Sequence, residues 1–208
     1  MASLKERIRE RVKQYRAVSK NDPEYGYLDL GRLFLREIPS EVWGLEGVRA
    51  LCLRFNNLSS LPAEIGQLQT LQELDLHWND LSTLPVEIWQ LKALKELDLS
   101  ENQLSTLPPE IGQLSALQNL NLDGNDLSSL PVEIGQLQAL QVLSLRNNQL
   151  SMPPAEIGQL HALRMLRLSI GKMVPIDGLP NLTHLLIEGV RSSNKKLPSK
   201  LGFKSQEL

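Results

Sequence analysis

The chain has 208 residues and a formal net charge of -2, with 41% hydrophobic, 22% charged and only 4% aromatic residues. This balance is typical of a folded chain and excludes a disordered one. No stretch approaches the ~20 consecutive apolar residues of a membrane span, so we expect no membrane partner. The single cysteine, Cys52, excludes an internal disulfide framework, and residues 1–10 hold no secretory signal. These features favour a cytoplasmic protein, with a secreted effector as the alternative.

Charge is distributed unevenly along the chain. Residues 1–20 hold seven Lys or Arg and two Glu, and residues 191–208 hold five Lys or Arg and one Glu. The segment between them is therefore strongly acidic. An acidic body repels phosphate backbones, which argues against nucleic acid as its ligand.

The first predicted element is a helix over residues 3–18. Ser3 and Glu6 have the spacing of a capping box, which satisfies two backbone N–H groups at a helix start. Leu4, Ile8, Val12 and Tyr15 form one narrow apolar stripe. We expect residues 1–24 to form an N-terminal capping helix and linker that covers the open end of the core. The alternative is a basic helix that binds anionic lipid or nucleic acid.

From residue 25 the chain divides into units of 23 residues, which begin at Tyr25, Val48, Leu71, Leu94, Leu117 and Leu140. A shortened unit begins at Leu163 and a degenerate one at Leu182. The unit 94–116 reads L-x-x-L-x-L-x-x-N-x-L followed by L-P-x-E-I-G-x-L. Its Leu97 and Leu99 are two residues apart, so they point to the same side of a short strand. One coil cannot bury seven aliphatic positions alone, so the coils must stack and share a core.

One polar residue recurs at the same place in five units. An interior Asn can donate to and accept from backbone groups that a turning chain leaves unpaired. We therefore predict a structural asparagine ladder, made of Asn56, Asn79, Asn102, Asn125 and Asn148.

These repeats resemble the leucine-rich repeats of bacterial intracellular proteins, and are similar to those of plant Ras-group proteins, Ras-pathway scaffolds and Roco GTPases. The resemblance implies an α/β fold: a right-handed leucine-rich-repeat solenoid of about eight coils with a parallel concave sheet. It covers residues 25–190, and residues 191–208 are expected to form a C-terminal cap or tail. It also implies binding of partner proteins on the concave face, without catalytic residues.

The residues that flank the inward-pointing leucines should face outward on the concave sheet. They form an aromatic and basic corner, an acidic floor and a basic end, and we predict partner binding by residues of all three zones. The predicted binding residues are Arg54, Phe55, His77, Trp78, Glu73, Asp75, Glu96, Asp98, Glu101, Asp123, Arg146 and Arg167. Exposed Trp, Phe and Arg are typical of binding hot spots, and the acidic floor would steer a basic segment. The alternative is that these charges are only solvated.

Two tryptophans, Trp43 and Trp89, stand where most units have Gly. We expect them to pack against a neighbouring coil, with a second interface as the alternative.

The sequence gives little sign of catalysis. It has neither a phosphate-binding glycine motif nor zinc-ligand spacing around Cys52. Asp29 and Asp75 should raise the pKa of the Cys52 thiol, and stacked acids such as Asp75 and Asp98 lie on an open sheet that does not exclude water. We predict no metal and no cofactor.

The function that fits best is a non-catalytic module that binds a partner protein, with a basic segment or a small GTPase as the partner. We expect the chain to be a monomer. The alternative is a recruitment or regulatory domain of a larger signalling GTPase or effector whose activity lies outside this chain.

Overall fold

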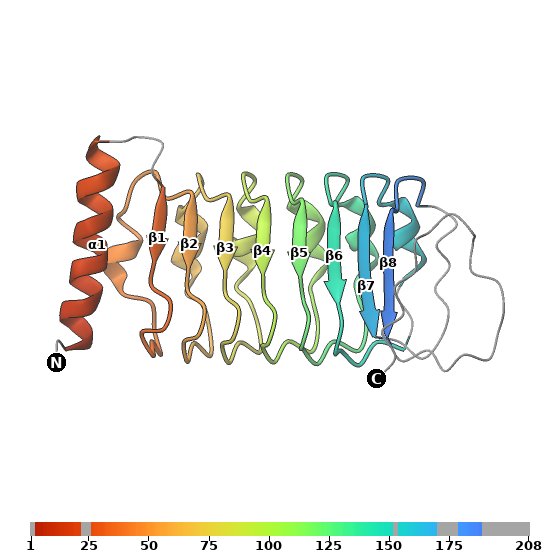
Figure 1. Ribbon diagram of the computed structural model, residues 1–208, viewed down its shortest axis with the longest axis horizontal. Helices are drawn as coiled ribbons and strands as arrows, with labels where there is room; N and C mark the ends of the chain where they lie inside the picture. Colours follow the sequence, from red (N-terminus) through yellow and green to blue (C-terminus); the bar gives the residue numbers. More distant parts are fainter. Residues whose placement is uncertain (1–2, 22–25, 152–153, 170–178, 189–208) are drawn as a thin grey trace.

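The computed structural model describes residues 3–21, 26–151, 154–169 and 179–188. It contains one α-helix, a row of short strands, and 3-10 helical turns between the strands (Figure 1). The helix α1 spans Leu4–Asn21, and the strands are β1 (Tyr27–Asp29), β2 (Ala50–Cys52), β3 (Glu73–Asp75), β4 (Glu96–Asp98), β5 (Asn119–Asn121), β6 (Val142–Leu145), β7 (Met165–Ser169) and β8 (His184–Glu188). The 3-10 turns are η1 (Ser40–Val42), η2 (Ala63–Gln67), η3 (Val86–Gln90), η4 (Pro109–Gln113), η5 (Val132–Gln136) and η6 (Ala155–Gln159).

The eight strands form one parallel sheet in which the order in space follows the order in sequence. Tyr27 pairs with Ala50, 23 residues later, and the same spacing continues to the pairing of Val142 with Met165. Met165 then pairs with His184, 19 residues later, where the predicted seventh unit is shortened. The 3-10 turns lie on the other side of the coils, behind the strands in Figure 1. The predicted α/β solenoid of stacked coils is therefore confirmed.

Each described 3-10 turn begins directly after a proline, and in η2 to η5 this proline is part of a Leu-Pro step. Proline has no N–H and a fixed φ, so it ends the extended segment without losing a hydrogen bond. Pro85 has extended backbone angles, and its carbonyl accepts the first N–H of the turn, that of Ile88, at 3.2 Å. The isoleucine of the turn is buried in every one of η2 to η6. The turn thus closes the coil and supplies one apolar residue to the core.

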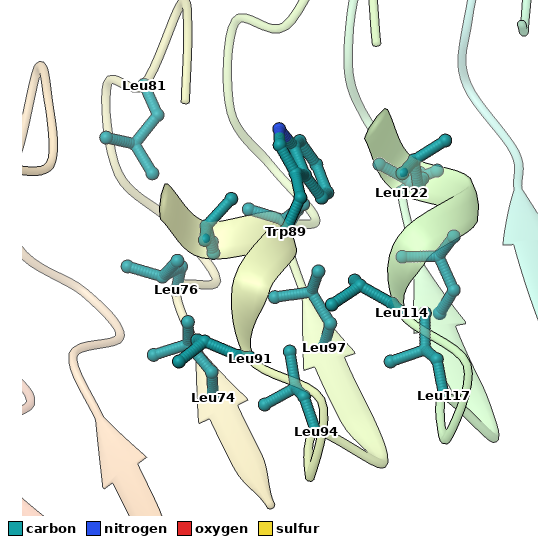
Figure 2. Packing of buried hydrophobic residues seen from close by; sticks show 14 of the residues in the cluster. Leu74, Leu76, Leu81, Trp89, Leu91, Leu94, Leu97, Leu114, Leu117 and Leu122 are labelled. Carbon is teal, nitrogen blue, oxygen red and sulfur yellow. The ribbon is translucent and has the colours of Figure 1, made fainter. Parts of the chain in front are cut away.

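The core is a continuous aliphatic column shared by all coils. Leu97 and Leu99, two residues apart, are both buried, as the strand geometry predicts. Trp89 is fully buried at 0% exposure and lies among the leucines of its own and adjacent coils (Figure 2). Its indole Nε1 has no hydrogen-bond partner among the described residues. Trp43 is half-buried and packs against the same core, so both tryptophans pack as predicted.

The asparagines lie between the coils and connect them. Asn79 Nδ2 donates to the carbonyl of Leu76 at 3.0 Å and to that of Leu53, in the preceding coil, at 3.1 Å. Its Oδ1 accepts the N–H of Leu58 at 3.1 Å. One amide side chain therefore satisfies three backbone groups that the turn leaves without a ladder partner. The same pattern recurs at Asn56, Asn102, Asn125 and Asn148.

Helix α1 covers the N-terminal end of the column (Figure 1). The backbone N–H of Ser3 donates to Glu6 Oε2 at 2.5 Å, and the N–H of Glu6 donates back to Ser3 Oγ at 3.3 Å, as a capping box requires. Val12 and Tyr15 are buried against the first coil, and the Tyr15 hydroxyl donates to the carbonyl of Glu46 at 2.8 Å.

The apolar stripe of α1 is not buried along its whole length. Ile8 is buried with Val12 and Tyr15, but Leu4 is 42% exposed, so the prediction was wrong at this residue. Leu4 lies in the first turn of the helix, at the rim of a hollow that Phe34 also lines. Among the described residues, no helix has both the length and the apolar content needed to cross a membrane. The predicted C-terminal cap, with Leu197, Leu201 and Phe203, lies outside the described residues.

Candidate functional site

The outward side chains of the strands form one continuous surface, called the sheet face below. Successive residues of a strand point to opposite sides, so the residues between the buried leucines must face outward. A shallow depression of about 370 Å³ runs along this face from β1 to β7. Its outward-facing lining consists of Tyr27, Ala50, Cys52, Glu73, Asp75, Glu96, Asp98, Asn119, Asn121, Val142, Ser144 and Arg167.

Phe55, His77 and Trp78 lie just after strands β2 and β3, and their rings contact one another. Together with Arg54, which precedes Phe55 in the sequence, they form a cluster next to the sheet face that we call the aromatic corner. The Phe55 and His77 rings contact edge to face, with centroids 5.2 Å apart and planes at 84°. The Phe55 and Trp78 rings are tilted, with centroids 5.7 Å apart. Trp78 is nevertheless 54% exposed. Edge-to-face and tilted contacts hold aromatic rings in fixed positions, so the corner presents a large apolar surface that is already ordered.

Phe55 and Trp78 share an unusual backbone conformation. The residue that precedes each ladder asparagine has a positive φ, and the same holds for the equivalent residue of the first coil. The values are 59° at Arg32, 53° at Phe55, 55° at Trp78, 53° at Glu101, 64° at Gly124 and 52° at Asn147. The left-handed backbone region favours glycine, but only one of these six residues is a glycine. A residue with a side chain costs roughly 1–2 kcal/mol in this conformation. The coil geometry therefore dictates the positive φ at this position. Phe55 and Trp78 adopt it despite the conformational free energy that it costs.

The aspartate column has a structural role that the sequence analysis missed. Asp75 Oδ1 accepts the N–H of His77 at 3.1 Å, and Asp98 Oδ1 accepts that of Ser100 at 2.9 Å. Asp29 and Asn121 accept the N–H two residues later in the same way. Such turns satisfy a backbone group where a strand ends, and Asp and Asn favour them. The repeated Asp or Asn between two leucines was the available signal.

These hydrogen bonds and partial burial set the pKa values of two aspartates in opposite directions. Burial has the largest effect and raises the pKa of Asp75. The His77 N–H lowers this pKa and the negative charge of Asp98 raises it, and the net result is a raised pKa. Burial also acts to raise the pKa of Asp29, but the Gly31 N–H and Arg11 outweigh it, so its pKa falls below the ordinary value. Arg11 Nη1 lies 2.9 Å from Asp29 Oδ2.

Among the side chains whose exposure the structure describes, three glutamates carry the exposed negative charge of the sheet face. Glu73, Glu96 and Glu101 are exposed, and Glu96 Oε1 accepts from Asn119 Nδ2 at 3.0 Å. Asp98 is half-buried and its Oδ2 accepts from Asn121 Nδ2 at 3.1 Å. We call Glu73, Glu96 and Glu101 the acidic strip, because they are the carboxylates that a ligand can reach most easily.

Asp123 does not join this strip, although the sequence placed it on the exposed acidic floor. It is only 8% exposed, and Arg146 holds its Oδ2 through Nη2 at 2.8 Å and Nε at 2.9 Å. Its Oδ1 accepts from Ser144 Oγ at 2.6 Å. The carboxylate therefore joins two coils, and the ion pair neutralises much of the charge expected at the basic end. Arg167 on β7 is half-buried and lines the depression.

The side chains with nucleophilic groups are arranged unfavourably for catalysis. Ser100 Oγ lies 2.5 Å from Asp98 Oδ1 and 2.7 Å from His77 Nδ1, so the serine stands between the acid and the imidazole. A carboxylate only accepts, so the single hydroxyl hydrogen is assigned to the contact with Asp98, and His77 Nδ1 is then the donor to Ser100 Oγ and not its base. Cys52 is buried, and burial together with Asp75 and Asp29 raises the pKa of its thiol. The described residues contain no group of three or more potential metal ligands.

A single-layer parallel sheet, an asparagine ladder and the 3-10 turns that connect β1 to β7 define a leucine-rich-repeat solenoid. The leucine-rich repeat region family matches residues 35–123 and 110–202. These matches cover most of the chain, so the chain belongs to the leucine-rich repeat family. The 23-residue intracellular subtype stays a prediction. No curated protein matches the chain.

Solved structures share the fold. A leucine-rich-repeat protein of Leptospira interrogans is 28% identical with a TM-score of 0.56, over 86% of this chain and 65% of that one. The plant peptide hormone receptor RGFR1 in complex with RGF2 is 28% identical with a TM-score of 0.62, over 74% of this chain and 30% of the receptor. A TDR receptor is 31% identical with a TM-score of 0.66, over 79% of this chain and 29% of the receptor. This chain therefore spans less than two thirds of each of these proteins.

Proposed function

We propose that the chain is a non-catalytic protein-interaction module that binds a partner protein on its sheet face. The observation that carries this proposal is the aromatic corner: Trp78 is 54% exposed although Phe55 and His77 hold its ring in place. Large exposed aromatic side chains that are already ordered lose little entropy on binding, and they dominate the energy of many interfaces.

The acidic strip adds a preference for charge to this surface. Glu96 lies beside Glu73 on the adjacent strand, and with Glu101 these carboxylates give the central coils an exposed negative surface. Such a surface attracts positively charged segments over roughly a Debye length of 10 Å and fixes their orientation. We therefore propose a partner with a basic segment, whose apolar residues contact the aromatic corner. A small GTPase is the more specific candidate that the family resemblance suggests.

The comparisons support a protein ligand in general. One matching structure is a plant peptide hormone receptor in complex with RGF2, which supports a peptide or protein as the ligand. Because this chain spans 30% of that receptor, a second candidate function is a recruitment domain within a larger protein. Both candidates use the same surface, and they differ in what lies outside the chain.

Affinity capture with matched variants tests the proposal. Wild type, Phe55→Ala/Trp78→Ala and Phe34→Ala are used as baits, and bound proteins are quantified by mass spectrometry. Phe34 is a suitable control because it is an exposed aromatic residue of positive φ outside the corner. We expect a protein that wild type and Phe34→Ala retain and the double variant loses, with equal circular dichroism. If all three baits retain the same proteins, the corner is not the binding site.

A further inference from the structure

Four arginines meet where α1 lies beside the first coils, in a cluster that we call the arginine pocket. Arg7 and Arg11 come from α1, Arg32 follows β1, and Arg54 follows β2. With Asp29 and Gly31 they line a hollow of about 310 Å³. The pocket adjoins the aromatic corner, because Arg54 belongs to both and the Arg32 guanidinium lies 4.8 Å from the centroid of the Phe55 ring.

Two of the four guanidinium groups are anchored by the protein itself. Arg11 Nη1 donates to the carbonyl of Asp29 at 3.0 Å and also contacts the carboxylate of Asp29. Arg7 Nη2 donates to the carbonyl of Arg32 at 3.2 Å. These contacts hold α1 against the first coil and fix the positions of both side chains, so one wall of the pocket is preorganised.

The other two guanidinium groups have few acceptors. Arg54 Nη1 forms a long ion pair with Asp75 Oδ2 at 3.9 Å, a distance too long for a hydrogen bond, so its N–H donors stay available. Arg32 contacts the face of an aromatic ring, which leaves its N–H donors available. A guanidinium has five donors. Within the described residues, Asp29 is the only carboxylate that lines the pocket, against four arginines.

The excess of positive charge selects the class of ligand. Four arginines against Asp29 and the Asp75 carboxylate that pairs with Arg54 leave an excess of two positive charges. A single carboxylate would compensate half of this excess, whereas a phosphate monoester carries about -1.5 to -2 charges at pH 7. Arginine binds phosphate oxygens through paired N–H donors, and several arginines can surround one phosphate. Gly31, which has no side chain, keeps the floor of the hollow open; a Cβ there would lie 3.2 Å from Arg54 Cγ.

We propose that the arginine pocket binds a phosphorylated side chain of the partner that docks on the sheet face. This inference rests on the proposed function, because the pocket borders the aromatic corner and a segment lying on the corner can extend into it. Phosphorylation of the partner would then control its binding, since the phosphate supplies the negative charge that the pocket lacks.

The test uses phenyl phosphate as the probe, because it carries the phosphate ester of a modified side chain. Chemical shifts of the arginine Nε–H groups are followed by NMR during titration into the whole chain, with inorganic phosphate and benzoate as comparison ligands. Arg32→Gln/Arg54→Gln removes the two guanidinium groups that have the fewest acceptors. Arg9→Gln/Arg16→Gln is the matched control, since it removes two exposed arginines of α1 that do not line the pocket.

We expect the Nε–H signals of Arg32 and Arg54 to shift with phenyl phosphate, and binding to weaken at least about tenfold in Arg32→Gln/Arg54→Gln, as expected when charge-assisted hydrogen bonds are removed. The control variant should bind as wild type does. Benzoate binding equal to that of phenyl phosphate would overturn the selection for phosphate. Equal binding of inorganic phosphate would overturn the assignment to a phosphorylated side chain in favour of the anion alone. Retained binding in the double variant would place the anion elsewhere.

Membrane lipids are the competing source of phosphate, and a separate experiment with vesicles tests them. Sedimentation with vesicles of phosphatidylcholine and phosphatidylserine should leave the wild-type chain in the supernatant. Sedimentation that Arg32→Gln/Arg54→Gln abolishes would overturn the proposal in favour of a lipid surface. The titrations require no partner, so their failure is distinct from a failure of the capture experiment.

Discussion

Arg146 binds Asp123 of the preceding coil through two side-chain nitrogens, Nη2 at 2.8 Å and Nε at 2.9 Å from the same carboxylate oxygen. The backbone N–H of Arg146 also donates to the other oxygen of Asp123 at 2.7 Å. The pair ends the exposed acidic part of the sheet face, because beyond it the carboxylate is buried and compensated. The charge pattern that a partner meets is therefore set by packing between coils as well as by sequence.

Asp123→Ala should destabilise the solenoid. The substitution removes the carboxylate to which Arg146 and the Ser144 hydroxyl donate, which costs about 1–3 kcal/mol of unfolding free energy. Urea denaturation measures the change. Glu73→Ala, at an exposed carboxylate, is the control and should change stability by less than about 0.5 kcal/mol. An effect of Asp123→Ala no larger than that of the control would contradict this role of the pair.

Asn102→Ala should lower the free energy of unfolding by at least about 2 kcal/mol, because it leaves several buried backbone groups without a hydrogen-bond partner. Asn102 Oδ1 accepts the N–H of Leu81, and its Nδ2 donates to the carbonyls of Leu76 and Leu99. Gln103→Ala is a matched exposed neighbour and should be nearly neutral. Thermal unfolding followed by circular dichroism distinguishes the two variants. Equal melting temperatures would mean that the ladder asparagine has no structural role.

Trp89→Phe and Trp89→Ala should differ sharply in their free energy of unfolding. The indole is fully buried, so truncation to Ala costs about 3–5 kcal/mol through lost packing and a cavity. Its Nε1 has no partner among the described residues, and Phe removes this unsatisfied donor while it keeps most of the ring. We expect Trp89→Phe to lie within about 1.5 kcal/mol of wild type. Equal losses of stability in the two variants by urea denaturation would contradict this expectation.

Asp75→Asn should change how stability depends on pH. Burial, followed by the charge of Asp98, raises the pKa of Asp75 above its ordinary value of 3.8 in the folded chain. The folded state then binds more protons than the unfolded state between 3.8 and the raised pKa, so stability falls as pH rises through that window. Asp75→Asn has no titrating carboxyl, so it removes this loss of stability. Its side-chain oxygen can still accept the hydrogen bond from the His77 N–H.

The variant should therefore gain stability relative to wild type above this window and show no gain below it. Asp29→Asn is the opposite control. The pKa of Asp29 is lowered in the folded chain, so its charge contributes stability above the unfolded pKa that is lost as pH falls. Asp29→Asn should accordingly be less stable than wild type at neutral pH. Urea midpoints measured from pH 3 to pH 7 test both signs, and two variants with the same sign would refute the assignment.

The repeat predicted the fold well because each position has one physical solution. Leu97 and Leu99 can be buried together only on the inner side of a strand, and Asn102 can be buried only with its hydrogen bonds made. The shortened unit after Leu163 likewise appears as the 19-residue register between Met165 and His184.

The sheet face was predicted less well, because side-chain pairing there depends on distances that the sequence does not contain. Asp123 was assigned to the exposed surface from its place in the repeat, but Arg146 of the next coil buries it. The hydrogen bond from the His77 N–H gives Asp75 a structural role that a charge map does not detect. Arg7 and Arg11 belong to the predicted capping helix, whose sequence does not indicate that the packing of α1 brings them to Arg32 and Arg54.

Site-specific photo-crosslinking tests the central claim, binding on the sheet face, most directly. Tyr27→p-benzoylphenylalanine places the crosslinker on β1, where the Tyr27 side chain lines the depression. Val132→p-benzoylphenylalanine places it on η5, on the opposite side of the coils, at a residue that is also exposed. We predict that the probe at Tyr27 traps the partner retained in the capture experiment and that the probe at Val132 does not. Trapping from Val132 alone would contradict the account and assign binding to the face of the 3-10 turns.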